Sequence, residues 1–343
     1  GDGAVAPADF VASPTVSPDG RTIAWVSWDH PDMPWDSTTL WVAPFDSTTG
    51  SLAGSPRAIV DRVRADGAQA SLVYPNWGPD GGLYVLTDAS GWWNLARVAS
   101  DGSLSPVIAL DADLCGPFWG FAPAPYAFLP DASVLITPRR GGNARLATVH
   151  AYEGGSERVI AEGWVGGSPS VSGARVLAII GTPARASQVC VIDLGASPPT
   201  LEVLRDADSS IPTDDISVGE AITFPTAGGA VAHATYYAPR NGSHAPVPGL
   251  LPPLMVLSHG GPTGATSAAY SPRVQFWTTR GFAVVDVDYR GSTGYGRAYR
   301  EALRDAWGVA DVDDCVAAAQ YLAEQGMADR SRLAIMGGSA GGY

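Results

Sequence analysis

Short runs of alternating apolar and polar residues fill the chain up to residue 215, and each run follows a tight-turn signal. Pro-Asp turns begin at Pro18, Pro79 and Pro130, and a fourth turn is expected near Ser172. β-Branched and aromatic residues follow each turn in rough alternation, as in Thr22–Val26. This arrangement predicts two antiparallel strands joined by a turn. A further strand is expected after three of these turns, in Thr38–Pro44, Trp93–Ser100 and Arg145–Tyr152.

One turn-linked antiparallel sheet for every ~50 residues is typical of a β-propeller blade. A single blade cannot bury both of its faces, so we expect neighbouring blades to cover one another. Four units are visible in residues 1–215, which is the low end for a closed propeller, so further blades are expected upstream. A β-sandwich with Pro-Asp turns is the alternative fold.

The pattern changes at residue 216. Two more strands are expected before the Pro-rich loop Ala245–Pro253, and buried-strand and helix signals alternate after it. The order strand, helix, strand, helix, strand is the mark of a parallel sheet with crossover helices. The expected strands lie in Leu254–Pro262, which ends in a Gly turn, in Phe282–Gly291 and in Arg332–Gly337, with a helix at about 268–280 after the first of them.

The second predicted helix carries one apolar stripe with a spacing of three or four residues. This stripe consists of Val309, Val312, Val316, Ala319 and Leu322. Asp311, Asp313 and Asp314 lie in its first turn, where they complement the helix dipole. Capping and solubility account for these three carboxylates better than metal binding does.

Composition and charge limit the kinds of partner that the chain is expected to bind. The net charge of −13 argues against nucleic acid, because polyanions would be repelled. The longest apolar run, Leu251–Leu257, is far shorter than the ~20 residues that span a bilayer, so no membrane partner is expected. The widely spaced Cys115, Cys190 and Cys315 favour three reduced, mostly buried thiols in a reducing compartment. No cofactor and no metal are expected.

The first ten residues, Gly1–Phe10, contain neither an initiator Met nor an apolar signal-peptide core. We therefore expect the interior of a longer, cytoplasmic protein, cut at both ends. Whether it forms a homo-oligomer stays open.

Ser339 stands at the centre of a G-x-S-x-G pattern, directly after the last predicted strand. Glycines at the flanking positions allow a tight strand-to-helix turn that lifts a nucleophile, because a Cβ there would collide with the neighbouring backbone. The pattern predicts a catalytic serine; a structural turn serine is the alternative. The chain is therefore predicted to be mixed: a partial β-propeller of about four blades (1–215), then the N-terminal half of an α/β-hydrolase domain (216–343) that ends at this nucleophile elbow.

Acyl transfer also needs hydrogen-bond donors for the oxyanion. One is expected from the backbone N–H of Ala340, the residue after the nucleophile. The other is expected from Gly261 in the His259–Pro262 loop, since a residue without a side chain lets its N–H approach the substrate. A plain tight turn is the alternative for this loop.

None of the five histidines follows Ser339. In this topology the triad runs Ser, then Asp or Glu, then His, so both partners are expected downstream. An upstream His259 could serve as the base only in a different fold. An unassisted serine is a poor nucleophile at neutral pH, so the 343 residues alone are expected to be inactive.

Several motifs together closely resemble the prolyl oligopeptidase family of serine peptidases, in its acylaminoacyl-peptidase and dipeptidyl-aminopeptidase-like branch. They are Leu257–Thr263, Phe276–Glu301, Trp307–Cys315 and Gly337–Tyr343, with Trp28–Asp36 and Ser90–Leu95 in the first half. The resemblance implies a propeller that caps an α/β-hydrolase domain, with Ser339 as nucleophile and Gly261 and Ala340 as oxyanion donors. It also implies an acid and a base after Tyr343. His259 stands where some relatives have an oxyanion-binding tyrosine, and the glutamates that grip a free amino terminus in some relatives have no counterpart that can be assigned.

The leading functional hypothesis is a serine peptidase that forms an acyl-enzyme and cleaves short peptides near their N-terminus. The propeller would exclude folded chains from the site and would also exclude water. A carboxylesterase of the same fold and a non-catalytic propeller scaffold are the alternatives.

Overall fold

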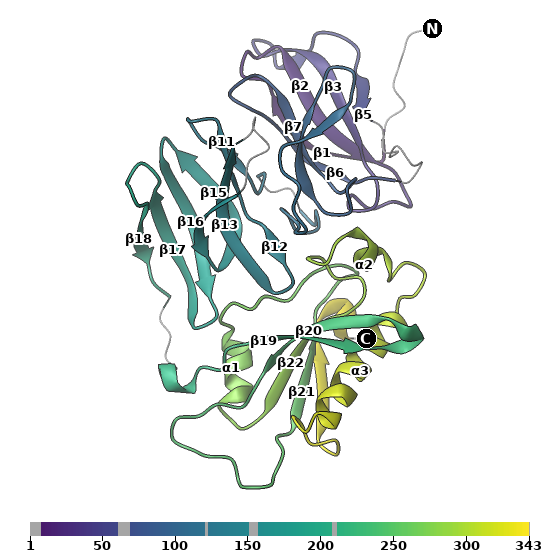
Figure 1. The fold of residues 1–343 in the computed structure, drawn as a ribbon. Coiled ribbons are helices and arrows are strands. Elements are labelled where there is room, and N and C mark those ends of the chain that lie inside the picture. The colour runs from purple at the N-terminus through teal and green to yellow at the C-terminus, as the bar shows by residue number, and fades with distance from the viewer. Residues whose placement is uncertain (1–7, 61–68, 121–122, 151–156, 208–210, 343) are drawn as a thin grey trace.

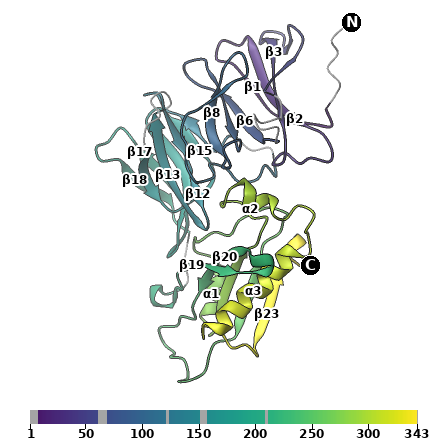
Figure 2. The ribbon, with the colours of Figure 1, turned by 45° about the vertical axis from the view of Figure 1, so that its right-hand side comes forward.

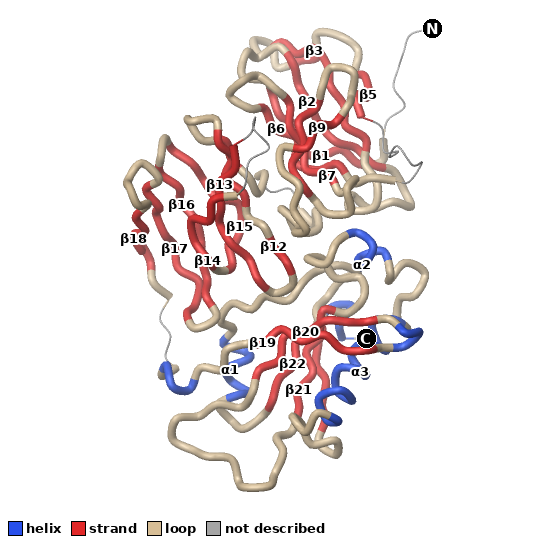
Figure 3. Tube along the Cα trace, viewed as in Figure 1, coloured by secondary structure: helices blue, strands red, loops and turns tan. Residues whose placement is uncertain are grey.

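The computed structural model describes residues 8–60, 69–120, 123–150, 157–207 and 211–342. Four antiparallel sheets come first along the chain, and a mixed sheet flanked by helices follows (Figure 1). Every helix of the described residues lies after residue 212 (Figure 3). None of these helices has the length and apolarity needed to cross a lipid bilayer.

The first two sheets are β1 (Phe10–Val16), β2 (Thr22–Trp28), β3 (Thr39–Asp46), β4 (Ser51–Leu52) and β5 (Arg57–Val60), then β6 (Leu72–Trp77), β7 (Leu83–Thr87), β8 (Asn94–Val98) and β9 (Leu104–Pro106). The third sheet is β10 (Ala127–Phe128), β11 (Ser133–Ile136), β12 (Arg139–Arg140), β13 (Asn143–His150) and β14 (Arg158–Glu162). The fourth is β15 (Trp164–Ser172), β16 (Arg175–Thr182), β17 (Arg185–Asp193) and β18 (Thr200–Arg205). All pairings within these sheets are antiparallel, as in propeller blades.

The Pro-Asp turns join the first two strands of the first three sheets, as the sequence predicts. In each turn the aspartate carboxylate accepts a hydrogen bond from the backbone N–H two residues later, from Arg21, Gly82 and Ser133 respectively. This Asx-type hydrogen bond gives a backbone N–H of the turn an acceptor that the pairing of the strands does not provide. The residue after the aspartate is left-handed in all three turns, with φ +73° at Gly20 and Gly81 and +65° at Ala132.

Neighbouring sheets share their hydrophobic cores, which is the reason why the unit repeats. On β11, Val134 and Ile136 pack in one core with side chains of the first two sheets, such as Leu40 and Leu86. Leu135, between them, points to the opposite core with Val176 of the fourth sheet. The alternation of period two thus makes one strand serve two cores, and the predicted propeller blades are confirmed.

The fifth sheet has the order β19-β20-β22-β21-β23. Its strands are β19 (Glu220–Pro225), β20 (Val231–Tyr237), β21 (Leu254–Ser258), β22 (Ala283–Asp288) and β23 (Leu333–Gly337). The last three strands are parallel, with β21 between β22 and β23, whereas β19 and β20 are antiparallel. The helices are α1 (Pro272–Thr278), α2 (Arg297–Glu301) and α3 (Ala310–Glu324), with short 3-10 turns η1 (Thr213–Asp215), η2 (Ala227–Gly229) and η3 (Ser339–Gly342).

Alternate residues of β21 face opposite layers. Leu254 and Val256 pack with α3, which crosses one face of the sheet (Figure 2), and Met255 and Leu257 pack with Val274 of α1 on the other face. A nearly continuous apolar strand is what a parallel sheet covered on both sides requires. The predicted start of an α/β-hydrolase domain is confirmed, with α1 shorter than predicted because it begins at Pro272, a residue suited to the first helical turn.

The predicted apolar stripe of α3 is wrong in part. Val309, Val312 and Val316 are exposed, whereas Ala319 and Leu322 are buried as predicted. The buried face also holds Asp314, which is fully buried and pairs with Arg290 at 2.8 Å. Small alanines on this face let the helix approach the sheet, and the buried ion pair fixes its rotation, so Asp314 has a structural role beyond capping and solubility.

The two halves of the chain meet at α2, which lies beneath the propeller in both ribbon views (Figures 1 and 2). Arg297 and Arg300 project from α2 and both pair with the fully buried carboxylate of Asp88 in the second sheet. Arg297 also donates to the carbonyl oxygen of Asp36 at 2.9 Å, and Arg300 to that of Trp35. One propeller carboxylate therefore holds two cations of the other half away from water.

A second buried carboxylate bridges the same interface. Asp113 accepts hydrogen bonds from the N–H of Trp93 at 3.0 Å and the N–H of Gly294 at 2.8 Å. Its burial raises the pKa of the carboxyl group. Backbone bonds from Gly141 to Gly294 and from Arg297 to Gly91 run alongside. These hydrogen bonds fix the relative register of the two halves.

We expect Asp88→Ala to destabilise the protein by about 3–5 kcal/mol, because it leaves the buried Arg300 guanidinium without a counter-charge and Arg297 with only the partly exposed Glu301 as its acidic partner. Thermal or denaturant unfolding measures this loss. The matched control is Glu324→Ala, which removes an exposed acid 3.9 Å from Arg330 and is expected to cost less than about 1 kcal/mol. Equal losses for the two variants would contradict the structural role given to Asp88.

Candidate active site

Three parallel strands bring the candidate site residues to one edge of the sheet. β21 runs into the loop His259–Thr263, β22 runs into Tyr289, and β23 runs into Ser339. In the register of the sheet, Ser258 of β21 lies beside Val287 of β22 and Gly337 of β23. The carboxyl edge of such a sheet is where α/β proteins usually place their ligands.

Ser339 adopts a left-handed backbone with φ +55°, which is unusual for a residue other than glycine. The turn is compact because a Cβ on Gly337 would overlap the carbonyl oxygen of Gly341. A Cβ on Gly341 would lie 2.5 Å from the carbonyl oxygens of both Ser258 and His259. Both flanking glycines are thus required by the backbone, and the exposed serine is held in a strained conformation.

The loop after β21 touches this turn. A Cβ built on Gly260 would lie 3.2 Å from Ser339 Cβ and 3.7 Å from Ser339 Oγ. Gly261 follows next to Tyr289, whose hydroxyl would lie 2.9 Å from a Cβ at this position. Ala340 is the second residue of the exposed turn η3. The structure therefore places the three residues singled out from the sequence, Ser339, Gly261 and Ala340, at one strand edge.

The His259 side chain makes hydrogen bonds that hold this loop in place. Its Nδ1 lies 2.7 Å from the carbonyl oxygen of Gly260, and its Nε2 lies 2.8 Å from Ser292 Oγ. The Tyr289 ring stacks on it, with centroids 4.2 Å apart, and the Tyr289 hydroxyl donates to the His259 carbonyl at 3.0 Å. Burial lowers the pKa of the imidazole. With both ring nitrogens engaged, His259 is not placed to take a proton from Ser339.

The other histidines of the described residues lie elsewhere. His233 bonds Thr223 and stacks on Tyr295, His244 bonds Asn241, and His30 lies edge-on to Phe10. His150 ends β13 in the third sheet, and it is exposed. None of them hydrogen-bonds to the Ser339 hydroxyl in the part of the chain that the structure describes.

A buried carboxylate that sequence reasoning missed supports the loop after Thr263. Asp288, fully buried at the end of β22, accepts hydrogen bonds from the Thr266 N–H at 2.7 Å, the Thr266 hydroxyl at 3.0 Å and the Tyr295 hydroxyl at 2.8 Å. Burial raises the pKa of Asp288. The sequence does carry a signal for this role, because Asp288 stands at the end of an apolar run that is typical of a fully buried strand. A carboxylate buried there needs hydrogen-bond partners.

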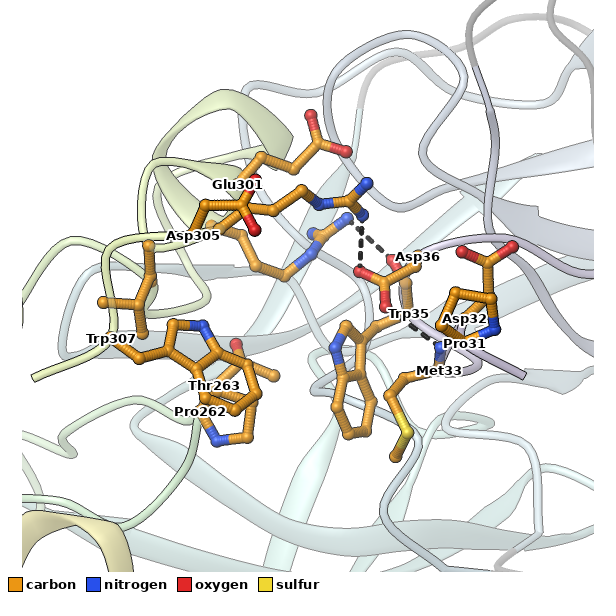
Figure 4. Close-up of a pocket in the computed structure, with 14 residues that line it drawn as sticks. Pro31, Asp32, Met33, Trp35, Asp36, Pro262, Thr263, Glu301, Asp305 and Trp307 are labelled. Carbon is orange, nitrogen blue, oxygen red and sulfur yellow. Dashed lines mark hydrogen bonds and ion pairs between the residues drawn. The ribbon is translucent and has the colours of Figure 1, made fainter. Parts of the chain in front are cut away.

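A cavity of about 670 Å³ opens between the propeller and the loop that contacts Ser339 (Figure 4). Trp307, Pro262 and Thr263 face Trp35 and Met33 of the first sheet's long loop across it. The Trp119 ring packs on Trp35 with centroids 4.4 Å apart and donates its indole N–H to the Thr263 carbonyl at 2.9 Å. Both halves of the chain therefore build the space beside the elbow.

All three cysteines are buried and free, as predicted. The strained serine turn, the adjoining glycine loop and the propeller together define the architecture of a two-part α/β hydrolase, of which this chain carries blades and the beginning of the hydrolase domain.

Comparison with known proteins agrees with this class. Residues 268–343 match the sequence model of the prolyl oligopeptidase family. The chain is 42% identical over 91 residues to dipeptidyl aminopeptidase BIII of Pseudoxanthomonas mexicana, covering 26% of this chain and 13% of that protein. It is 33% identical over 132 residues to acylamino-acid-releasing enzyme 2 of rice (Oryza sativa subsp. japonica), covering 38% and 15%.

The solved structure of a puromycin hydrolase superposes with a TM-score of 0.88 at 35% identity, over 97% of this chain and 49% of that one. The predicted resemblance is confirmed: residues 268–343 match the prolyl oligopeptidase family, and nearly the whole chain is similar to a solved puromycin hydrolase. It spans about half the length of the solved relative.

We expect Gly341→Ala to lower the melting temperature and to distort the elbow, because its Cβ would meet two backbone carbonyl groups that cannot rotate away. Gly338→Ala, three residues earlier in the same turn, is the matched control, because a Cβ there would have nothing within 4 Å. Thermal unfolding compares the two variants. Similar melting temperatures for both would mean that the turn is not as tight as described.

A pH prediction follows from Asp286 on β22. Burial, and then the nearby Asp288, raises the pKa of Asp286 to about 7. Between about pH 4 and pH 7 the unfolded chain loses a proton that the folded chain keeps, so stability falls as the pH rises through this window and levels off above it. Asp286→Asn removes this dependence.

The stabilisation that Asp286→Asn gives should therefore grow from pH 4 to pH 7, by at most about 4 kcal/mol. Urea unfolding at several pH values measures it. The exposed Asp111 provides the control, because Asp111→Asn should give no such growth. A gain from Asp286→Asn that is the same at pH 4.5 and pH 7.5 would refute the prediction.

Proposed function

We propose that the polypeptide that contains this chain is a serine peptidase acting near the amino terminus of short peptides. Ser339 is the nucleophile, and the backbone N–H groups of Gly261 and Ala340 stabilise the oxyanion. The observation that carries the proposal is the strained, left-handed Ser339 beside Gly260 at the carboxyl edge of the sheet. Strain of this kind concentrates at functional sites.

In this mechanism Ser339 Oγ attacks the carbonyl carbon of the scissile bond, and its proton passes to a histidine base. The base and its acidic partner come from outside residues 1–343, because no described histidine hydrogen-bonds to the Ser339 hydroxyl and in this topology both partners follow the nucleophile. The oxyanion forms next to the two N–H donors, and collapse of the tetrahedral intermediate expels the amine, which takes the proton from the imidazolium. Water then hydrolyses the ester on Ser339 and restores the serine.

Short substrates are favoured because the propeller residues Trp35 and Met33 close over the cavity beside the elbow. Such a cover keeps folded chains out of the site. The relatives named dipeptidyl aminopeptidase, acylamino-acid-releasing enzyme and puromycin hydrolase support peptides and related amides as substrates. Three unpaired thiols support a cytoplasmic location.

A carboxylesterase would use the same elbow, and a non-catalytic scaffold would need no nucleophile at all. The propeller cover favours the peptidase over the esterase, and the strain at Ser339 argues against the scaffold. Hydrolysis of aminoacyl-naphthylamides and puromycin, compared with nitrophenyl esters, separates the two enzymes. Activity on esters alone would refute the peptidase.

We expect a fluorophosphonate probe to label the full-length polypeptide at Ser339, as read by peptide mass spectrometry. Ser339→Ala should abolish labelling and lower kcat by about 10⁶-fold, since it removes the nucleophile. Residues 1–343 alone should label weakly or not at all. Strong labelling of these residues alone would contradict a base outside them, and labelling at another serine would overturn the role of Ser339.

A further inference from the structure

The loop between β20 and β21 contains a reactive pair of residues that the proposed function does not use. Asn241 is followed by Gly242, and this is the only Asn-Gly pair in the sequence. The side-chain amide of an asparagine can condense with the backbone nitrogen of the next residue to form a succinimide, and ammonia is released. A glycine in the second position favours this reaction, because it has no Cβ to hinder the approach and its backbone turns freely.

The Asn241 side chain is folded back over the peptide bond that leads into Gly242. Its Oδ1 accepts a hydrogen bond from the Ser243 N–H at 2.8 Å, which closes an Asx turn. Its Nδ2 donates to the carbonyl oxygen of Thr279 at 3.0 Å, so both ends of the amide are fixed. Because the Asx turn encloses Gly242, the amide carbon Cγ is held next to the backbone nitrogen that would attack it.

The attacking nitrogen has a carboxylate as its hydrogen-bond acceptor. The Gly242 N–H donates to Asp215 Oδ1 at 2.5 Å, and Asp215 lies in the 3-10 turn η1. A Cβ at position 242 would lie 3.2 Å from Asp214 Cβ and 3.3 Å from the same Oδ1, so the loop and η1 approach each other closely. A backbone nitrogen is a poor nucleophile while it keeps its hydrogen, and Asp215 is placed to accept that proton.

The amide oxygen, on which negative charge develops during the attack, has two donors. One is the Ser243 N–H, and the other is the imidazole of His244, whose Nδ1 lies 3.2 Å from Asn241 Oδ1. An amide oxygen can only accept, so Nδ1 carries the hydrogen in this contact. Two donors aimed at one carbonyl oxygen stabilise an oxyanion, as they do in acyl transfer. Acceptor and donors therefore converge on a single amide group.

We propose that Asn241 and Gly242 form a self-modifying site, with Asp215 as the base. The Gly242 nitrogen loses its proton to Asp215 and forms a bond to Asn241 Cγ, while Oδ1 takes up the electron pair of the carbonyl bond. When this carbonyl forms again, the bond from Cγ to Nδ2 breaks, and Nδ2 leaves as ammonia with the proton that Asp215 held. Water then opens the succinimide at Cγ, which gives aspartate, or at the main-chain carbonyl, which gives isoaspartate.

The site is open to the water that the second step consumes and is remote from the candidate active site. Gly242, Ser243 and His244 are exposed, and Asn241 is partly exposed. Asn241 bonds to Thr279, which precedes β22, whereas Ser339 lies at the opposite, carboxyl edge of the sheet. The inference is therefore independent of the proposed peptidase function.

The modification acts on the segment that joins the two halves of the chain. The turn η1 follows the last propeller strand, β18, and precedes β19. Beside the bond from Gly242 to Asp215, Arg240 Nε donates to the carbonyl oxygen of Asp214 at 2.9 Å. Conversion adds a negative charge close to Asp215, and isoaspartate also adds a carbon atom to the main chain. Both changes weaken the contact between the loop and η1.

The test follows the conversion in full-length protein that carries Ser339→Ala, so that the peptidase does not digest its own chain. Peptide mass spectrometry measures aspartate and isoaspartate at position 241 over time at neutral pH. The synthetic peptide Ala238–Pro246 is the reference, because it has the same Asn-Gly pair and His244 but lacks Asp215. We expect conversion to be about tenfold faster in the folded protein than in the peptide. An equal or slower rate in the folded protein would overturn the proposal.

Asp215→Asn tests the base, because its amide oxygen still accepts the Gly242 N–H but takes up no proton. We expect this variant to convert about tenfold more slowly. Asp214→Asn is the matched control, since it removes the neighbouring carboxylate of the same turn, which makes no hydrogen bond to Gly242 in the described structure, and its rate should not change. An unchanged rate for Asp215→Asn, or equal slowing by both variants, would overturn the role of Asp215.

The converted protein carries an additional negative charge, so anion-exchange chromatography separates it from the unconverted protein. We expect the converted fraction to unfold at a lower temperature, because its contact with η1 is weakened. Equal melting temperatures for the two fractions would contradict the effect of the modification on the joining segment.

Discussion

The close approach of backbone to backbone at the serine turn is the constraint on which the candidate site depends. Gly341 lies against the carbonyl groups of Ser258 and His259 so closely that no side chain fits between them. This contact joins the end of β23 to the end of β21, and it forces Ser339 into the left-handed region. Because the strand ends are fixed by the sheet, the serine and the glycine loop have little freedom to separate. The arrangement on which the proposed acyl transfer depends is thus a consequence of sheet packing.

The second constraint is electrostatic and acts between the two halves. Interfaces between two parts of one chain generally allow relative motion of those parts. Here Asp88 and Asp113, both buried in the propeller, hold Arg297, Arg300 and the Gly294 backbone of the other half. Burying a charged side chain costs free energy unless the charge is paired. The interface therefore favours one relative placement of the two halves, even where it contributes little to the free energy of unfolding. It places the Trp35 loop over the elbow and thereby builds the cavity from segments that are far apart in sequence.

Local chemistry made much of this predictable. Pro-Asp turns, strand alternation and the glycine pattern around Ser339 depend on residues within a few positions of each other, and the structure has the blades, the sheet and the turn where the sequence predicts them. The burial of Asp314 was not predictable, because its partner Arg290 lies on another element and overrides the apolar stripe of Val312 and Val316. The same holds for the pairing of Asp88 with α2 and for the cavity around Thr263, which depend on how the two halves dock. Sequence periodicity carries no information on such long-range contacts.

The most direct test of the central claim is a crystal structure of the full-length protein after reaction with an organophosphate. The account predicts phosphorus on Ser339 Oγ, with a phosphoryl oxygen within about 2.7–3.1 Å of the backbone nitrogens of Gly261 and Ala340. An adduct on a different residue, or a phosphoryl oxygen turned away from both amides, would contradict it.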